Sequence, residues 1–476
     1  MNEHPPRSWT RHAAWAAPCA LALLVFLALH SEGLSIEQAP DPAGALFAAD
    51  DQLSQSDADT ITFSRDIAPI LQENCQLCHQ PGAIAPMSFM TYDEVRPWGP
   101  IIQREVVRRN MPPYHYDTDV GIQELQHDRR LSDEDIETIV RWVRAGMPEG
   151  DPADLPEPVE WPDPAEWRLA EEFGPPDHVI PSDPYTVPAR GQDIWWQPMV
   201  ESGITENRCI RAIEVKPSLA GRAATHHANS TFHVQNEDGE WVRSARLTEY
   251  ALGKLGEVVP EDACRIAPAD SRVVWDIHYY PSGDMIEDDV VEIGLWFHPD
   301  EVADQLEYDQ TLTLYYLDAG DPNLRDYYIP PHETLMTQGM YSFDHPVRID
   351  SFQPHGHLRL TAKKLEIYHP DTGERELVSQ VSNWNPGWHL SHMYEPHAAP
   401  LMPAGSIMII TAWYDNTAAN PWNPDPDQWV GPGDRTTDEM SHAWIAITHL
   451  DEEGFETLVA EREERERQFT EASDDQ

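Results

Sequence analysis

Lysine is nearly absent from this chain of 476 residues: Lys216, Lys254, Lys363 and Lys364 are the only four. Arginine does not make up the difference, because Lys and Arg together number 32 against 83 Asp and Glu, and the formal net charge is −51. A protein that binds nucleic acid by neutralising phosphates needs the opposite balance, so nucleic acid is not an expected partner. The excess of carboxylates favours a solvated acidic surface.

Long apolar runs are also missing, apart from one near the N-terminus. There Arg7 and Arg11 precede an apolar run over 13–29, which is the pattern of a secretory signal peptide. The run is shorter than the ~20 residues of a typical membrane span, which favours cleavage over anchoring, so we predict a signal peptide over 1–32. We therefore expect a periplasmic or secreted protein with no stable membrane span after the signal is removed.

Cysteine is scarce, with five in the chain, and Cys19 lies in the predicted signal. Cys75 and Cys78 share one motif, which leaves Cys209 and Cys264 as an even pair in an oxidising compartment. We expect a disulfide between these two, although a pair of buried free thiols fits the same count. On the chain-entropy model such a disulfide would stabilise the folded state by roughly 4 kcal/mol.

What the chain does contain is enough apolar sequence for large cores, with 40% hydrophobic residues and 17 Trp. The 270 residues from 189 to 458 hold many short strand-like runs separated by turn residues. This length is too great for one simple sandwich, so we expect two. The predicted fold class is multidomain: a small all-α domain followed by two all-β antiparallel sandwich (jelly-roll) domains. The expected segments are a flexible acidic lead-in over 33–60, the helical domain over 61–150, a proline-rich linker over 151–188, sandwiches over 189–325 and 326–458, and a charged tail over 459–476.

The helical domain contains the sequence Cys75-Gln76-Leu77-Cys78-His79, a C-x-x-C-H motif. Two thiols at this spacing can add to the two vinyl groups of a haem, and the adjacent histidine can coordinate the iron from one side. A zinc site would need a second Cys/His pair nearby, and a redox dithiol would not need the histidine. The motif therefore favours haem c over these two rivals.

Helical patterns flank the motif on both sides. Ser64 is placed to cap a helix before it, and Ser132 opens a second helix with a capping-box pattern. This order resembles a small class I cytochrome c over 61–150. The resemblance implies a methionine as sixth iron ligand in a proline-rich loop ahead of the last helix. Met111 fits that position, and Met87 is the alternative.

Histidines in the strand-rich half form three groups that could bind a metal. His226 and His227 are adjacent, His278 lies in a strand-like run, and His355 and His357 are two apart. Residues two apart on a strand point to the same face, so the last pair can hold one ion. An adjacent pair faces opposite ways on a regular strand and needs a bulge or a turn to converge. Imidazole suits copper, zinc, iron and nickel, and a thioether partner favours copper.

Met440 follows these three groups and precedes another strand-like run. In this order, the residues resemble the metal ligands of the copper type II, ascorbate-dependent monooxygenases. That family includes peptidylglycine α-hydroxylating and dopamine β-monooxygenase, and the resemblance covers roughly 185–450 and all six ligand positions. It implies an electron-transfer copper in the first sandwich and a catalytic copper in the second. By this resemblance the first ion is held by His226, His227 and His278, with His233 as an alternative third ligand, and the second by His355, His357 and Met440.

Three positions depart from the peptide-hydroxylating members of that family. Those enzymes carry Arg two residues before the H-x-H pair, and Asn and Tyr two and four residues after the methionine ligand. Here the residues are Gln353, His442 and Trp444. Since the three groups anchor the substrate carboxylate in those enzymes, a peptide C-terminus is not the expected substrate. Asp276 stands where the family pattern has Gln, and it adds negative charge near the first copper.

A further histidine group lies in an aromatic stretch. It consists of His389, His392 and His397, which flank Trp384, Trp388 and Tyr394. These side chains could line a substrate pocket, but we favour a loop packed with aromatic residues.

We therefore predict a copper-dependent monooxygenase with two copper ions and a haem c, which hydroxylates a C–H bond of a small organic substrate with O2. An external donor, either an ascorbate-like reductant or a redox protein, would supply electrons, and the tethered haem would relay them to the first copper. Two alternatives stay open. One is a copper and haem electron-transfer or copper-binding protein that hydroxylates nothing, and the other is a copper oxidase acting on a metal ion or a small reductant.

Overall fold

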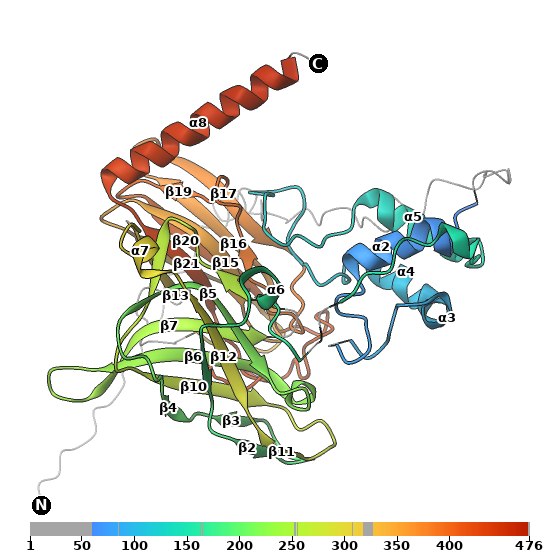
Figure 1. The fold of residues 1–476 in the computed structure, drawn as a ribbon, viewed down its shortest axis with the longest axis horizontal. Helices are drawn as coiled ribbons and strands as arrows, with labels where there is room; N and C mark the ends of the chain where they lie inside the picture. Colours follow the sequence, from blue (N-terminus) through green and yellow to red (C-terminus); the bar gives the residue numbers. More distant parts are fainter. Residues whose placement is uncertain are drawn as a thin grey trace, which may run out of the picture. The chain divides into compact units, whose positions relative to one another are not determined.

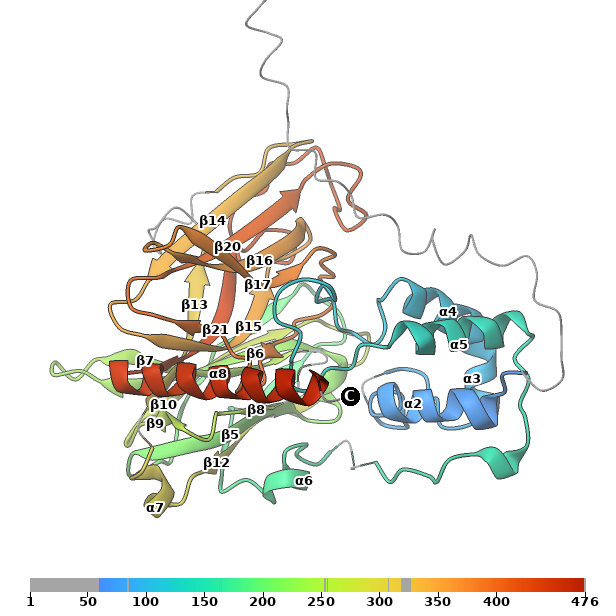
Figure 2. The same ribbon diagram turned by 90° about the horizontal axis from the view of Figure 1, so that it is seen from above.

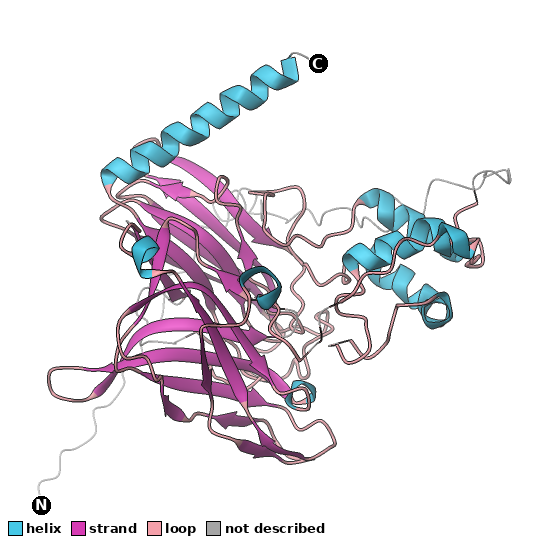
Figure 3. Ribbon diagram, in the orientation of Figure 1, coloured by secondary structure: helices cyan, strands magenta, loops and turns pink. Residues whose placement is uncertain are grey.

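The computed structural model describes residues 60–474, with gaps at 84, 162, 164, 252–253, 255, 307 and 318–326. The predicted signal peptide over 1–32 and nearly all of the lead-in over 33–60 lie outside the described residues. Within the described part of the chain, no helix is long and apolar enough to cross a membrane. Strands dominate from residue 178 onward, whereas most of the helices come before it (Figure 3).

The helical part begins with a π-helical turn, η1 (Phe63–Ile67), which continues into α2 (Ala68–Asn74). Its cap is Thr62, whose hydroxyl accepts a hydrogen bond from the backbone N–H three residues later. The predicted cap, Ser64, was wrong. This serine is buried and donates its hydroxyl hydrogen to the carbonyl of Glu149 at 3.0 Å, so it ties the start of the helix to a distant part of the chain.

The last helix of this part, α5 (Asp133–Arg144), was predicted correctly. Ser132 caps it, since its hydroxyl accepts a hydrogen bond from the Asp135 N–H at 3.1 Å. The buried face of α5 packs against η1 and α4 (Figure 1). The helices and turns that precede it are α3 (Tyr92–Val95), η2 (Arg96–Trp98) and α4 (Gly99–Val107).

The proline-rich segment over 151–188 contacts both the helical part and the strands. The side-chain amide of Gln72 in α2 donates to the carbonyl of Glu157, and Lys216 donates to the carbonyl of Ala165. We expected a linker throughout, but the end of the segment belongs to the sheets. Its regular elements are η3 (Pro152–Asp154), α6 (Ala170–Phe173), β1 (His178–Pro181) and β2 (Tyr185–Val187).

The strands form two sandwiches that share one long sheet. In strand order, this sheet consists of β1, β12 (Val291–Phe297), β5 (Arg208–Pro217), β9 (Ala263–Ala267), β13 (Tyr308–Tyr316), β21 (His442–His449), β15 (Val347–His355) and β18 (His392–Met393). Two short strands pair at its side: β8 (Glu257–Val258) with β5 and β19 (Leu401–Met402) with β15.

A second sheet faces each half of the shared sheet. Against the first half lie β3 (Ile194–Trp196), β10 (Arg272–Tyr279), β6 (Thr225–Gln235) and β7 (Trp241–Ala251), with β4 (Met199–Glu201) at the side. Against the second half lie β14 (Thr334–Ser342), β20 (Ile407–Asp415), β16 (Leu360–His369) and β17 (Glu374–Val381), as Figure 2 shows. Fully buried apolar side chains from both layers form each core, such as Trp275 with Leu295 and Ile445 with Ile367. The remaining elements are β11 (Ile286–Asp289), which pairs with β2, and η4 (Gly221–Ala223), α7 (Asp300–Ala303) and α8 (Glu452–Asp474).

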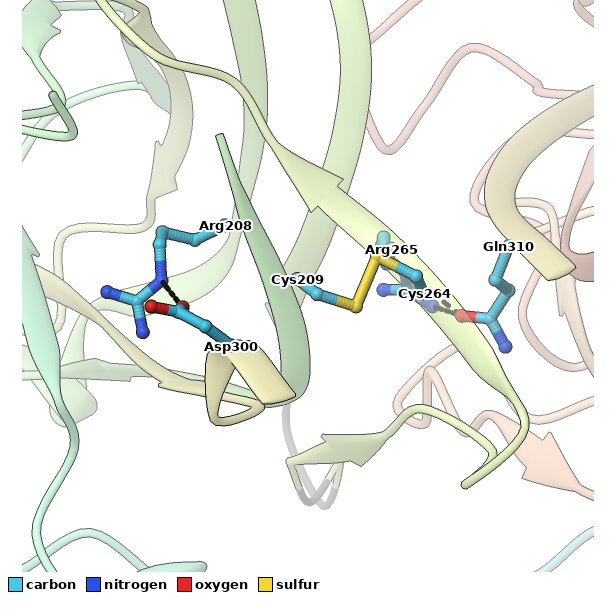
Figure 4. Close-up of a disulfide and its surroundings, with 6 residues drawn as sticks. All are labelled: Arg208, Cys209, Cys264, Arg265, Asp300 and Gln310. Atoms are coloured by element: carbon cyan, nitrogen blue, oxygen red, sulfur yellow. Dashed lines mark hydrogen bonds and ion pairs between the residues drawn. A yellow bond between two sulfur atoms is a disulfide. The ribbon is translucent and has the colours of Figure 1, made fainter. Parts of the chain in front are cut away.

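The two sandwiches join through a parallel pair of strands, β9 and β13. This corrects the prediction of antiparallel sheets throughout. It also places the division between the sandwiches before β13 and not at residue 325, because β13 pairs with β21 of the second sandwich from Asp309 to Tyr316. The predicted disulfide is confirmed: Cys209 on β5 is bonded to Cys264 on β9, next to this junction (Figure 4).

A buried ion-pair cluster lies at the same junction. Arg265, next to the disulfide, donates to Gln310 of β13 at 2.7 Å (Figure 4). Arg265 also pairs with Glu257 at 2.9 Å. Glu257 also pairs with Lys254 at 2.7 Å. Burial alone raises the pKa of Glu257, but the two cations outweigh burial and hold this pKa at about 2.

We expect this cluster to make stability depend on acid pH. A carboxyl group whose pKa is lower in the folded state contributes stability above its unfolded pKa of 4.5, and that contribution is lost as pH falls towards 2. The contribution of Glu257 is on the order of 3 kcal/mol. Urea unfolding from about pH 6 down to pH 2 should show a shallower decline in Glu257→Gln than in the wild type. Parallel pH profiles for the two proteins would contradict this assignment.

Candidate metal centre

Three histidines of the first sandwich converge where β6 pairs with β10. His278 of β10 lies directly opposite His227 of β6, and Tyr279 lies opposite Thr225. His226 is therefore the extra residue of a β-bulge, and a bulge redirects the side chain it carries. This is the irregularity that an adjacent histidine pair needs in order to converge.

The geometry of this first triad fits a metal ion. One ring nitrogen from each histidine lies within 4.8 Å of the others. The ring centroids are 5.4, 5.1 and 5.0 Å apart. The Nδ1 atoms of all three are buried and accept or donate no hydrogen bond, a state that costs free energy unless a ligand satisfies it. Among the described residues, His278 and not His233 completes the group.

Trp195 and Asp193 contact His278, and burial keeps the triad neutral. A carboxylate oxygen of Asp193 lies 3.2 Å from His278 Nε2 and places a negative charge beside this ring. Trp195 stacks on the same ring, with centroids 4.4 Å apart. Burial lowers the pKa of His278, while the nearby carboxylates of Asp193 and Asp276 raise it and so oppose that change. Burial likewise lowers the pKa of His226 to about 4, and neutral imidazole is the form that binds a metal.

The second predicted group lies at the end of β15. The ring centroids of His355 and His357 are 5.5 Å apart. The Nδ1 of His357 donates to the backbone carbonyl of Asp438 at 3.2 Å, which leaves the Nε2 lone pair available to a metal. The Nδ1 of His355 is buried without a hydrogen-bond partner. The predicted third ligand, Met440, is half-buried two residues beyond Asp438.

The carboxylate of Glu439 connects the H-x-H segment to the methionine segment. It is fully buried and accepts hydrogen bonds from three backbone N–H groups, those of His357, Arg359 and Met440. These bonds attach the backbones of His357 and Met440 to the same carboxylate oxygen. The sequence gives no sign of this role, because an acidic residue in a turn is usually solvated and the Arg359 partner comes from another turn, 80 residues away.

The role of Lys363 is likewise not apparent from the sequence, because one of its partners lies 79 residues away. Lys363 of β16 is fully buried, and its ammonium donates to the carbonyls of His355 at 2.5 Å and His442 at 2.6 Å. It therefore holds β15 and β21 together behind the second group. Burial lowers its pKa to about 7.

Two of the three residues that depart from the peptide-hydroxylating pattern take part in the site's own packing. Gln353 is buried, accepts a hydrogen bond from Lys254 at 3.1 Å and donates one to Glu249. His442 stacks on His355 with centroids 4.4 Å apart. Both side chains are thus engaged within the protein.

The aromatic loop places its histidines differently. His392 packs against Tyr116 and Tyr114, as expected for a loop filled with aromatic residues. His389, in contrast, lies between the two metal groups, with its ring centroid 4.8 Å from that of His355 and 5.6 Å from that of His226. The sequence does not distinguish these two histidines, because both lie in the same aromatic stretch.

The C-x-x-C-H motif forms the turn that follows α2. The backbone N–H groups of Cys78 and His79 both donate to the carbonyl of Cys75, at 3.1 and 3.0 Å, and the two thiols are not bonded to each other. The Nδ1 of His79 donates to the carbonyl of Met87 at 3.1 Å, and the ring stacks on Phe89 at 4.1 Å. The Nε2 edge is thus available to an iron. The backbone of Met87 thus lies on the Nδ1 side of His79, away from the Nε2 edge.

The segment after Met111 docks on the second sandwich. Its side chains Tyr116 and Leu125 belong to the core of that sandwich. Gly121 has a φ of +69°, and a Cβ at this position would lie 2.3 Å from the carbonyl oxygen of Val378, so only glycine permits the approach. Backbone N–H groups of the segment donate to carbonyls of β17 and β18, in the pairs Asp117 to Gln380, Ile122 to Val378 and Gln126 to Met393, at 2.8–2.9 Å.

Comparison with known proteins adds no family. No family model and no curated protein matches the chain. Among solved structures, PNGF-II matches at 10% identity with a TM-score of 0.25, over 57% of this chain and 65% of that chain. The major capsid protein P2 from Bacteriophage PM2 matches at 6% identity with a TM-score of 0.26, over 58% of this chain and 99% of that chain. The CBM22-1-CBM22-2 tandem domain from Paenibacillus barcinonensis Xyn10C matches at 9% identity with a TM-score of 0.15, over 58% of this chain and 98% of that chain.

Proposed function

We propose that this protein is an exported copper-dependent monooxygenase that hydroxylates a C–H bond of a small organic substrate with O2. The observation that carries the proposal is the convergence of His226, His227 and His278, with three buried Nδ1 atoms that lack partners. These are the positions that the copper monooxygenase resemblance assigns to the first copper. Copper, when bound, supplies the one-electron and O2 chemistry, and this chain supplies ligand geometry and exclusion of water.

The second group supports the catalytic role of the proposal. His355, His357 and Met440 would hold the second copper, and the thioether of Met440 favours the reduced ion. Glu439 positions two of these three residues through their backbones, and Lys363 fixes the carbonyl of the third. Because such anchors lock the ligand segments before the metal arrives, they reduce the ordering cost of binding.

The surroundings of Cys78 support a covalent haem. Cys75 and Cys78 would carry it, with His79 and Met111 as axial ligands. A haem bears two carboxylates, and the cavity beside Cys78 is lined by five basic side chains and by one carboxylate, that of Glu214. In a chain with a net charge of −51 such a cluster is unusual. Its members are Arg129, Arg168, Lys216, Arg222 and Lys254.

Docking of the segment over 114–126 supports the electron relay. The segment follows the proposed axial ligand Met111 and is hydrogen-bonded to the second sandwich. Its His115 lies 5.1 Å from Trp384, and Trp384 lies 6.5 Å from His389, measured between ring centroids. The haem domain would thus be attached to the second sandwich through this segment, in addition to the connection through the proline-rich segment. An external donor, ascorbate-like or a redox protein, would reduce the haem.

The proposal is tested on the haem-loaded full chain purified from a periplasm. Copper per haem should be close to two in the wild type and close to one in Met440→Ala. With a chemically reduced haem, O2 should reoxidise it only in the two-copper protein. Under ¹⁸O₂, candidate small organic substrates should acquire label. O2 consumption without label in any product would instead favour the oxidase alternative, and a folded, haem-loaded protein without copper would end the proposal.

A further inference from the structure

Two histidines lie in the interface between the segment over 114–126 and the second sandwich. His115 belongs to the segment, and His392 belongs to β18 of the sandwich. We infer that this pair is an acid-sensitive latch, which holds the segment on the sandwich while both rings are neutral and releases it when they take up protons. The inference goes beyond the proposed copper and haem chemistry, because the contacts that dock the segment are made by protein groups alone.

The two rings meet inside the interface. Their centroids are 5.7 Å apart, and the ring planes cross at 83°. His392 is fully buried against two aromatic side chains of the segment, with its centroid 5.0 Å from that of Tyr114 and 4.2 Å from that of Tyr116. His115 packs against Trp384 of the aromatic loop, at 5.1 Å. Protonation of either ring would therefore place a charge among buried aromatic rings, which costs free energy.

The groups around the pair do not compensate a positive charge. Both ring nitrogens of His115 are buried and have no hydrogen-bond partner among the described residues. Arg130 is itself a cation: its guanidinium lies 5.3 Å from the Tyr114 ring and pairs with the carboxylate of Asp128. No carboxylate offsets burial at either histidine. The other titratable side chains around the pair are Tyr114, Tyr116, Tyr394 and His389.

Burial keeps both rings neutral while the segment is docked. It lowers the pKa of His115 from 6.5 to about 4. It is also the largest cause at His392, where His115 and Arg130 lower the pKa further and a contact with the backbone of Phe352 opposes them. In the released segment both rings return to the ordinary pKa of about 6.5. The released state therefore binds more protons below pH 6.5, and docking weakens as the pH falls from there towards 4.

Release of the segment would open the backbone hydrogen bonds that join it to β17 and β18. Such local opening is a sub-global transition of one part of the fold. In the proposed relay it would also remove His115 from Trp384, so the supply of electrons from the haem would fall in acid. This consequence, unlike the latch itself, rests on the proposed function.

Hydrogen exchange of the full, haem-loaded chain tests the latch. The backbone N–H groups of Asp117 and Ile122 donate to carbonyls of β17 and report opening of the segment. With a pKa of 6.5 when released and about 4 when docked, His115 alone raises the opening constant about 20-fold between pH 7 and pH 5. After correction for the pH dependence of chemical exchange, protection of the two amides should fall by at least about this factor of 20.

Three variants isolate the histidines. His115→Phe keeps an aromatic ring and removes the unpartnered nitrogens, so it should stay docked at pH 7 and show an acid response smaller by at least about tenfold. Adding His392→Phe should abolish the response. His397→Phe changes a half-buried histidine of the aromatic loop outside the pair, and it should respond as the wild type does. If a phenylalanine variant fails to fold by circular dichroism, His115→Gln replaces it with the expectation for His115→Phe.

An acid response of wild-type size in a folded His115 variant would overturn the inference, and so would full protection of both amides in the wild type at pH 5. The rate at which O2 reoxidises the reduced haem is a separate readout. Loss of protection in acid with an unchanged rate of haem reoxidation would still support the latch and would count against the proposed relay.

Discussion

Replacing His278 by alanine should lower the copper content of the purified protein from two ions per chain to one. The triad would keep only the two histidines of the bulge, and two nitrogens hold a copper ion far more weakly than three. Since the first copper is the proposed entry point for electrons, reoxidation of the reduced haem by O2 should slow by at least an order of magnitude. Copper analysis and stopped-flow absorbance of the haem measure the two effects.

The control for this prediction is His233→Ala. His233 lies on the same strand as the bulged pair, opposite Arg272, but outside the triad. It should keep two coppers and the wild-type rate of haem reoxidation. Loss of copper in His233→Ala but not in His278→Ala would mean that the alternative third ligand is the correct one. Equal copper content in the wild type and both variants would mean that the triad does not bind copper.

Replacing Glu439 by glutamine should destabilise the protein and empty the second site. In the wild type the Glu439 carboxylate accepts hydrogen bonds from three backbone N–H groups, two of which belong to proposed copper ligands. An amide offers a single acceptor oxygen and turns its NH₂ group towards at least one of these donors. Hydrogen bonds to a charged acceptor contribute about 1.5–3 kcal/mol each, so we expect a loss of about 3 kcal/mol in the free energy of unfolding. Urea unfolding of the copper-free protein measures this loss.

The neighbouring carboxylate provides the matched control. The side chain of Asp438 pairs with the exposed Arg435, and only the backbone carbonyl of Asp438 contacts His357. Asp438→Asn should therefore cost under about 1 kcal/mol, as is usual for surface ion pairs, and should keep both coppers. If Glu439→Gln were as stable as Asp438→Asn and still bound two coppers, the anchoring role of Glu439 would be wrong.

Local patterns in the sequence were enough to predict several elements. Ser132 and the apolar spacing behind it define α5, because capping and helical periodicity act within a few residues. The strand-like run over 273–280 corresponds to β10 for the same reason. The cysteine count paired Cys209 with Cys264 correctly, since only two thiols remained outside the motif.

The tertiary structure decided the features that join distant segments. The bulge at His226 arises only when β6 meets β10, so the pairing register and not the His-His sequence makes the triad converge. The parallel contact of β9 with β13 joins the sandwiches, and no local pattern encodes a partner strand.

The roles of Glu439 and Lys363 and the position of His389 beside His355 likewise come from contacts across the fold. Lys363, for example, binds the carbonyls of residues 8 and 79 positions away. By itself the sequence determined which side chains could bind copper and haem, because ligand chemistry belongs to residue types. The structure decided which of them meet, because convergence depends on strand register and packing between segments far apart in the chain.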